Sequence, residues 1–130
     1  MIGIDTTALI DFFKKNENLK LILDEIDDTF TTTILNYQEI MFGLDLENLN
    51  HIKEESFYDK MFGDLLVFDL DKESAKKSSK IYWQTKNEGN VFGKFDCMIA
   101  AIFLSNGVNK IITKTAKHFD NIPGLKVLSY

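Results

Sequence analysis

The sequence contains no arginine: all fifteen of its basic residues are lysines. A lysine ammonium is a point charge without the planar fork that clamps phosphate or reads guanine, so strong base-specific readout of nucleic acid is not expected. The net charge of -5 also excludes any general attraction to nucleic acid. A nucleic-acid ligand would have to be held by local lysines and by metal ions.

Cysteine, proline and long apolar runs are also scarce. The single cysteine, Cys97, excludes an internal disulfide, and its apolar neighbours predict a small buried side chain in a reducing compartment. The longest apolar run, residues 97–104, is far too short to span a bilayer. Asp5 and Asp11 interrupt the one stretch that could serve as a signal peptide. We therefore expect a cytoplasmic protein with no membrane partner.

The composition is that of an ordinary globular protein, with 45% hydrophobic and 27% charged residues among 130. This length predicts one domain spanning residues 1–130. Short β-branched runs alternate with segments of helical spacing, which predicts a parallel sheet with helices on both faces. The expected strands are residues 1–5, 29–33, 65–70, 110–113 and 125–130, and the expected helices are residues 6–13, 19–26, 34–44, 48–62, 72–87 and 95–104.

Three carboxylates stand where such a fold could bring them together. Asp5 stands at the carboxyl end of the first strand, at the sheet edge where ligands bind in open α/β folds, although it could equally cap the next helix. Glu39 has capping-box spacing from Asn36, but the preceding threonine run offers an earlier cap and would leave Glu39 inside the helix, in need of a partner or a cation. Asp96 opens the most apolar helix, again as a cap or as a site residue.

Carboxylates gathered in one place raise each other's pKa values and repel unless a cation neutralises them. An oxygen-only set of ligands selects Mg²⁺ or Mn²⁺ over zinc, and the sequence has no competing cluster of cysteine and histidine. Such an ion activates water and stabilises the charge that develops on a phosphodiester. Hydrolysis of nucleic acid is therefore the leading chemistry.

Four segments in order, residues 2–6, 39–43, 95–101 and 112–125, resemble the PIN-domain family, in particular the VapC-type toxin ribonucleases of toxin-antitoxin pairs. The resemblance implies a three-layer α/β/α sandwich with a central parallel sheet of four or five strands. It further implies a Mg²⁺- or Mn²⁺-dependent endoribonuclease that acts on RNA, forms a homodimer and is inhibited by a cognate antitoxin. The same resemblance assigns Asp5, Glu39 and Asp96 as the catalytic and metal-binding residues.

The sequence departs from the family at Thr115, where the family commonly has Asp or Asn. A hydroxyl adds no charge, so we expect weaker binding of a second metal or a single-metal mode. Thr6, Thr115 and Lys114 are candidates for positioning water or substrate.

The sequence also predicts where several residues outside the site lie. We expect Lys72, Lys76, Lys77 and Lys80 on a solvated face, and Ile81, Tyr82 and Trp83 in the core or at a dimer surface. Core packing is expected to account for most of the large apolar residues outside the catalytic half, and some of them could form a groove for an antitoxin helix. These residues are Phe12, Phe13, Leu44, Phe57, Tyr58, Met61 and Phe62.

Two other classes remain open at this point. A degenerate PIN-like module could bind RNA or a protein without catalysis, and Thr115 is the feature that favours it. A phosphoacceptor receiver domain could use Asp5, Asp69, Thr113 and Lys114, but it leaves Glu39 and Asp96 unexplained. The Asp69-Leu70-Asp71 sequence also resembles a phosphatase nucleophile motif, but the end of a strand followed by a helix cap explains it better.

Overall fold

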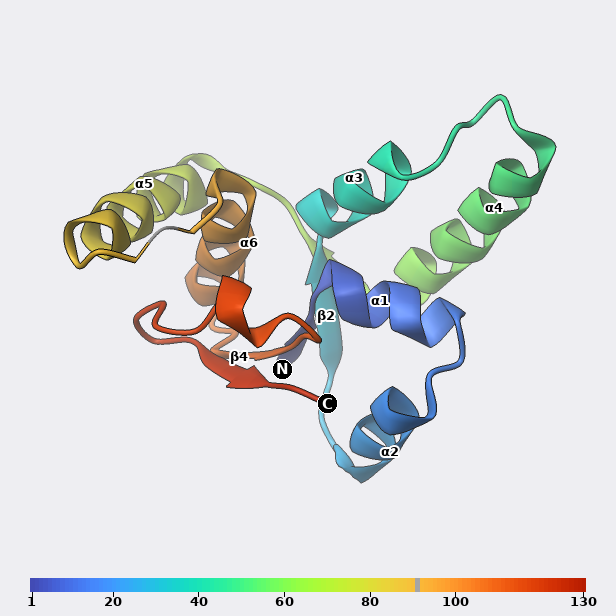
Figure 1. Cartoon of the computed structure of the whole chain (residues 1–130), viewed down its shortest axis with the longest axis horizontal. Coiled ribbons are helices and arrows are strands. Elements are labelled where there is room, and N and C mark those ends of the chain that lie inside the picture. Colours follow the sequence, from blue (N-terminus) through green and yellow to red (C-terminus); the bar gives the residue numbers. More distant parts are fainter. Residues whose placement is uncertain (91) are drawn as a thin grey trace.

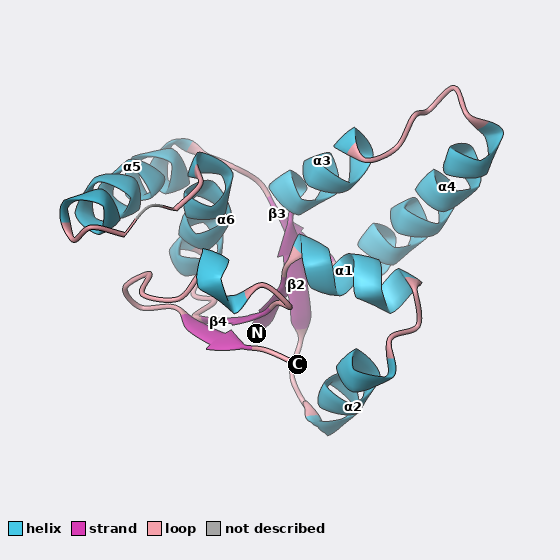
Figure 2. Ribbon diagram, viewed as in Figure 1, coloured by secondary structure: helices cyan, strands magenta, loops and turns pink. Residues whose placement is uncertain are grey.

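A computed structural model describes residues 1–90 and 92–130, and these residues form an α/β fold built on one sheet. Five short strands are all parallel and lie in the order β3-β2-β1-β4-β5 (Figure 1, Figure 2). This confirms the predicted α/β class and the parallel sheet, at the upper of the two expected strand numbers. The strands are β1 (Ile2–Ile4), β2 (Phe30–Thr33), β3 (Leu66–Phe68), β4 (Lys110–Ile112) and β5 (Lys126–Leu128).

Four of the α-helices follow a residue whose side chain accepts a hydrogen bond from the first turn: Asn16, Thr33, Asn48 and Asp71. Thr33 and Asn36 form a capping box at the start of α3, and Asp71 and Ser74 form one at the start of α5. Asp71 is therefore a helix cap, as the sequence predicts. The helices are α1 (Thr6–Phe13), α2 (Glu17–Glu25), α3 (Ile34–Phe42), α4 (Leu49–Asp64), α5 (Lys72–Asn87) and α6 (Lys94–Ser105), with a short 3₁₀ helix η1 (Ala116–His118).

Helices cover both faces of the sheet. Neighbouring residues of a strand point to opposite faces, so each strand contributes side chains to a core on either side. On β4, Ile111 packs into a core with α5 and α6, whereas Ile112 packs into a second core with α1, α2 and α4. Gly3 faces the α6 side, where a Cβ atom would come 2.7 Å from the ring of Phe103. This position therefore requires glycine, and the two helical layers enclose the sheet as expected.

The chain changes direction across the sheet between β1 and β4. It runs outward from β1 through β2 to β3, then crosses to β4 on the other side of β1 and ends at β5. Ligands of open α/β sheets bind at such a switch point, beyond the carboxyl ends of the strands. Asp5 and Thr113 are the residues that directly follow β1 and β4. Among residues 1–90 and 92–130, no helix has the length and apolar character to cross a bilayer.

The strand order contradicts the receiver-domain alternative. A receiver has the strand order 2-1-3-4-5, whereas β3 lies at the edge of this sheet, separated from β1 by β2. Asp69 follows β3 and is exposed. It is therefore far from the switch point where a phosphoacceptor would have to stand beside Asp5.

Candidate active site

Asp5 is buried, with 4% of its surface exposed, and is held by side chains from two neighbouring segments. It occupies the N-cap position of α1, yet its carboxylate makes no capping hydrogen bond. Instead, Asn36 Nδ2 donates to one carboxylate oxygen over 3.1 Å, and the Thr113 hydroxyl donates to the other over 2.9 Å. The carboxylate is thus fixed at the switch point rather than used to begin the helix.

Asn36 and Thr6 connect Asp5 to Glu39. The Asn36 side-chain amide also donates to the Thr6 hydroxyl (3.0 Å), and that hydroxyl donates to Glu39 Oε1 (2.7 Å). Because the capping box of α3 pairs Thr33 with Asn36, Glu39 has no role in starting the helix. Glu39 therefore lies inside α3, half-buried, in the same hydrogen-bond network as Asp5.

Asp96 reaches the same edge of the sheet from the first turn of α6. The N-cap of that helix is Gly93, and no side chain caps it, so Asp96 is not the cap. Its side chain is 20% exposed and lies 3.6 Å from Nδ1 of His118, which belongs to η1. A protonated His118 would pair with this carboxylate and help to hold it at the site.

The three carboxylates share an electrostatic environment. Burial raises the pKa of Asp5, and the Thr6 amide together with the Thr113 and Thr7 hydroxyls and His118 lowers it in part. Burial is also the main cause that raises the pKa values of Glu39 and Asp96. The charges of Asp5 and Asp96 further raise the pKa of Glu39, and the charge of Asp5 raises that of Asp96. The acids therefore destabilise one another when ionised.

This set of donors fits a hydrated divalent cation. Among residues 1–90 and 92–130, no three acidic, histidine or cysteine side chains stand close enough to form a preassembled metal cage. Mg²⁺ does not require one, because it keeps several water ligands and is held in proteins by one or two carboxylates. In the same part of the chain no lysine ammonium lies within 4.0 Å of Asp5, Glu39 or Asp96. Their negative charge therefore remains available for a cation.

Two of the three positioning candidates lie at this edge, and the third points its charge away. Thr6 bridges Asn36 and Glu39, as described above. The Thr115 hydroxyl lies 3.3 Å from that of Thr113, so it is one side chain removed from Asp5. The Lys114 ammonium lies 3.7 Å from Asp11 instead, and only its backbone amide reaches the site, where it donates to the Thr7 hydroxyl (3.1 Å).

Asn36 and Thr113 are site residues that the sequence analysis did not assign. Both had a signal in the sequence. Asn36 lies one helical turn before Glu39, and residues three apart share a helix face. Thr113 directly follows β4, which pairs with β1 in the parallel sheet, so it shares the carboxyl edge with Asp5. What the sequence does not show is that their side chains face Asp5.

These pKa shifts predict a pH dependence that is opposite to that of most carboxylates. A raised folded-state pKa stabilises the protein fully below the unfolded-state value, 3.8 for Asp96, and this stabilisation is lost as the pH rises through the folded-state value. We expect Asp96→Asn to abolish this contribution. In urea unfolding with a chelator, the stability of the variant relative to the wild type should therefore improve between pH 4 and pH 7. An unchanged difference over this range would show that Asp96 is not destabilised by its surroundings.

The sequence as a whole matches one family of known proteins. A family model described as "PIN domain" matches residues 2–125. No curated protein matches the sequence.

Solved structures of the same fold come from several bacteria. The chain superposes on one from VapBC2 of Rickettsia felis bound to a promoter DNA fragment with a TM-score of 0.85 and 17% identity, covering 100% of this chain and 99% of the other. For DNA-bound VapBC from Salmonella typhimurium the TM-score is 0.84 at 22% identity, with 98% and 96% covered. For VapC20 of Mycobacterium tuberculosis, a toxin that cleaves the sarcin-ricin loop, the values are 0.62 and 10%, with 85% and 87% covered. At these identities the likeness establishes the fold.

Proposed function

Because the chain belongs to the PIN-domain family, we propose that it is a Mg²⁺- or Mn²⁺-dependent endoribonuclease and the toxin of a toxin-antitoxin pair. PIN domains are typically metal-dependent. The observation that carries the proposal is the convergence of Asp5, Glu39 and Asp96 at the switch point, with raised pKa values and no ammonium partner among the described residues. Ionised carboxylates that are buried close together lower the stability of the folded protein unless a cation binds them.

Each residue of the site would have its own role toward the cation. Asp5 and Asp96 would hold the cation, with Asp5 fixed by Asn36 and Thr113 and Asp96 reaching the ion from the first turn of α6. Glu39, oriented by Thr6, would contact the cation or accept a proton from its water. A bound divalent cation supplies Lewis acidity and an activated water for attack on the phosphodiester.

Cleavage of a mixed structured RNA by the purified protein tests this activity. We expect cutting that requires Mn²⁺ or Mg²⁺ and stops on addition of a chelator. RNA binding without cutting, under every metal condition, would instead support a degenerate PIN-like module. Thr115 is the residue that favours this alternative, because its hydroxyl adds no charge beside Thr113.

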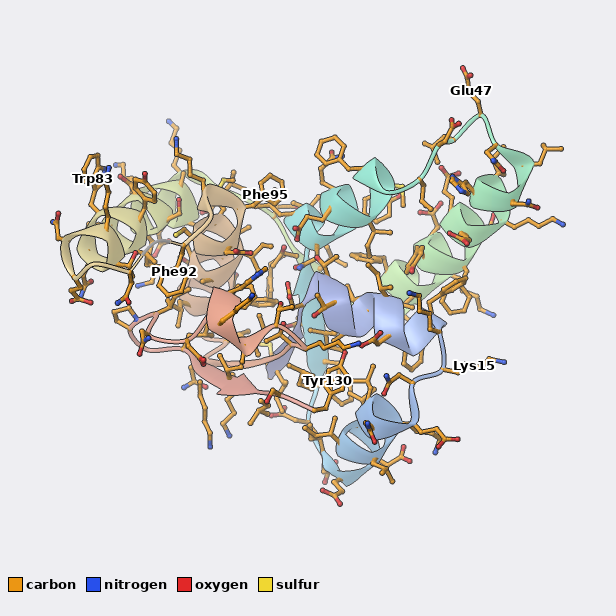
Figure 3. All side chains as sticks on the ribbon, in the orientation of Figure 1. Lys15, Glu47, Trp83, Phe92, Phe95 and Tyr130 are labelled. Carbon is orange, nitrogen blue, oxygen red and sulfur yellow. The ribbon has the colours of Figure 1, made fainter. Side chains whose placement is uncertain are left out.

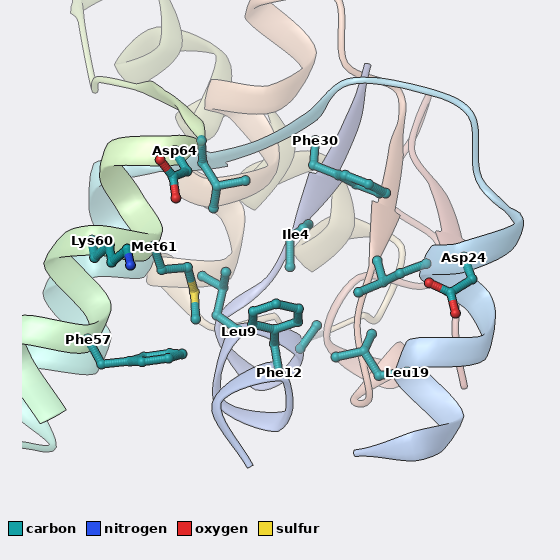
Figure 4. Close-up of a pocket in the computed structure, with 13 residues that line it drawn as sticks. Ile4, Leu9, Phe12, Leu19, Asp24, Phe30, Phe57, Lys60, Met61 and Asp64 are labelled. Carbon is teal, nitrogen blue, oxygen red and sulfur yellow. The ribbon is translucent and has the colours of Figure 1, made fainter. Parts of the chain in front are cut away.

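The proposed antitoxin would dock on the opposite side of the molecule from the α5–α6 layer. A cavity of about 500 Å³ opens there, with mainly apolar walls from α1, α2 and α4 (Figure 4). Phe12 and Phe57 line it, with 51% and 39% of their surfaces exposed. An amphipathic helix binds in such a groove through apolar side chains. The solved relatives named above include VapBC complexes, in keeping with a protein partner.

Phe12→Asp should weaken binding of the antitoxin encoded beside this chain at least about 100-fold, because it places a charge in an apolar groove. RNA cleavage should not change, since Phe12 lies at the far end of α1 from Asp5. Phe42→Asp is the matched control, an exposed phenylalanine at the end of α3 that does not line the cavity. Calorimetric titration measures both affinities, and equal loss in the two variants would contradict this placement.

The proposal also includes the homodimer that the family resemblance implies. Its test is the molar mass of the purified chain in solution, measured by light scattering.

A further inference from the structure

Helix α5 and the start of α6 carry a positive charge that the rest of the chain does not share. Residues 72–94 contain six lysines and two acids, whereas the remaining residues contain nine lysines and eighteen acids. Five of the six lysines are exposed and Lys77 is partly exposed, and within the described residues none has a carboxylate within 4.0 Å. Their charge is therefore free to attract an anionic ligand to one side of a protein that is acidic overall.

Three of these lysines and the only tryptophan form a line along the outer face of α5. Lys72, Lys76, Lys80 and Trp83 follow one another at intervals of four, four and three residues, which places them on one side of a helix. The opposite side, with Ile81 and Thr85, is buried. Figure 3 shows Trp83 projecting from the outer surface of α5. Trp83 is therefore not a core residue, since 55% of its surface is exposed, and the other expected location, a dimer surface, stays a prediction.

Tyr82 and Lys86 lie beside Trp83 at the C-terminal end of this line. The Lys86 ammonium lies 4.9 Å from the ring centre of Trp83 and 5.7 Å from that of Tyr82. The two rings meet edge to face, with centres 5.6 Å apart. A nucleobase can stack on an exposed indole ring, and neighbouring lysines can neutralise the phosphates of the same strand.

The same surface continues toward the candidate active site. The Lys94 ammonium also lies over the Tyr82 ring, 5.8 Å from its centre. Lys94 belongs to the first turn of α6, two residues before Asp96. A strand bound along α5 would thus be directed toward the helix end that carries Asp96.

We propose that the outer face of α5, with Trp83 as the stacking residue and Lys72, Lys76, Lys80, Lys86 and Lys94 as phosphate contacts, binds a single-stranded segment of the RNA substrate. This inference rests on the proposed ribonuclease function and adds a binding surface to it. Single-stranded RNA fits this surface better than a protein does, because lysine is depleted at the centre of protein interfaces, whereas lysine and exposed aromatic rings together typify sites for single strands.

Binding is tested apart from cleavage by using Asp96→Asn protein in a chelator and a short, unstructured, fluorescently labelled oligoribonucleotide. On this background, Trp83→Ala should weaken binding about tenfold or more, and Trp83→Phe should restore most of the affinity, because the phenyl ring still stacks. Lys80→Gln combined with Lys86→Gln should reduce the slope of log affinity against log salt by about 1.4, since each phosphate that a lysine no longer neutralises removes about 0.7 from the slope. Lys53→Gln combined with Lys60→Gln, exposed lysines of α4, is the matched control. Fluorescence of Trp83, the only tryptophan, should be quenched on binding.

Each contrary outcome has one meaning. Equal affinity and salt slope for all variants would overturn the α5 surface even if the wild type cleaves RNA. A change in molar mass for Trp83→Ala with unchanged RNA affinity would also overturn it and assign this face to a second copy of the chain. RNA binding that disappears in the α5 variants, together with a wild type that cuts no RNA with any metal, would support the surface and reject the ribonuclease.

Discussion

Asp96→Asn is expected to lower metal-dependent RNA cleavage at least about 100-fold, comparable to the loss of one preorganised electrostatic group from an active site. The amide keeps the shape of the side chain but removes the charge that would hold the cation. The variant should nevertheless fold, because Asp96 makes no capping hydrogen bond and its ionised form is disfavoured by burial. Its thermal stability in a chelator should equal or exceed that of the wild type.

Asp69→Asn is the matched control for this variant. Asp69 is also an aspartate, but it is exposed at the edge of the sheet, and its substitution should leave cleavage and metal response unchanged. Added Mn²⁺ should raise the melting temperature of the wild type and of Asp69→Asn, and should raise that of Asp96→Asn much less. Full cleavage by Asp96→Asn would remove this residue from the site.

Asn36→Leu should lower the free energy of unfolding by about 2–4 kcal/mol, since it leaves several buried polar groups without partners. Asn36 is fully buried, and its side-chain oxygen accepts from the amide and hydroxyl of Thr33 while its amide donates to Asp5 and Thr6. Leucine has the same branching at Cγ and a larger volume, so the substitution leaves no cavity and the loss would come from the hydrogen bonds.

Gln38→Leu on the same helix is the control, because Gln38 is exposed and a change there should alter stability by less than about 0.5 kcal/mol. Thr33→Ala separates the capping role from the link to Asp5 and should cost about 1 kcal/mol. Urea unfolding measures all three variants. If Asn36→Leu cost no more than Thr33→Ala, the hydrogen bonds to Asp5 and Thr6 would contribute nothing to stability.

Most of the fold could be predicted from the sequence because its signals are local. The helices of residues 6–13 and 72–87 were predicted with the bounds that the structure shows, since polar breaks and capping residues coincide with the ends of their periodic patterns. Strand ends were less accurate. Residues 125–130 were predicted as a strand, but only Lys126–Leu128 pair with β4, because an apolar run does not show where pairing stops.

The site was harder to predict because its contacts join distant segments. The sequence places the Asp5 carboxylate at the same turn whether Asp5 caps the helix or belongs to a site. Only the hydrogen bonds from Asn36 and Thr113, 31 and 108 residues away, distinguish these two roles. The exposure of Trp83 could have been predicted, since it lies on the same helical stripe as Lys76 and Lys80, which were assigned to solvent. The aromatic residues of α4 could not be sorted by pattern alone: Tyr58 and Phe62 are buried, whereas Phe57 is exposed.

The most direct test of the central claim is a crystal structure of the chain soaked with Mn²⁺, with anomalous scattering measured to locate the ion. We predict a peak bound by carboxylate oxygens of Asp5 and Asp96, with Glu39 in direct contact or linked through a water molecule. Asp96→Asn crystals treated in the same way should show a much weaker peak. A peak elsewhere on the protein, or no peak at a Mn²⁺ concentration that supports RNA cleavage, would contradict the assignment of these three acids as the metal site.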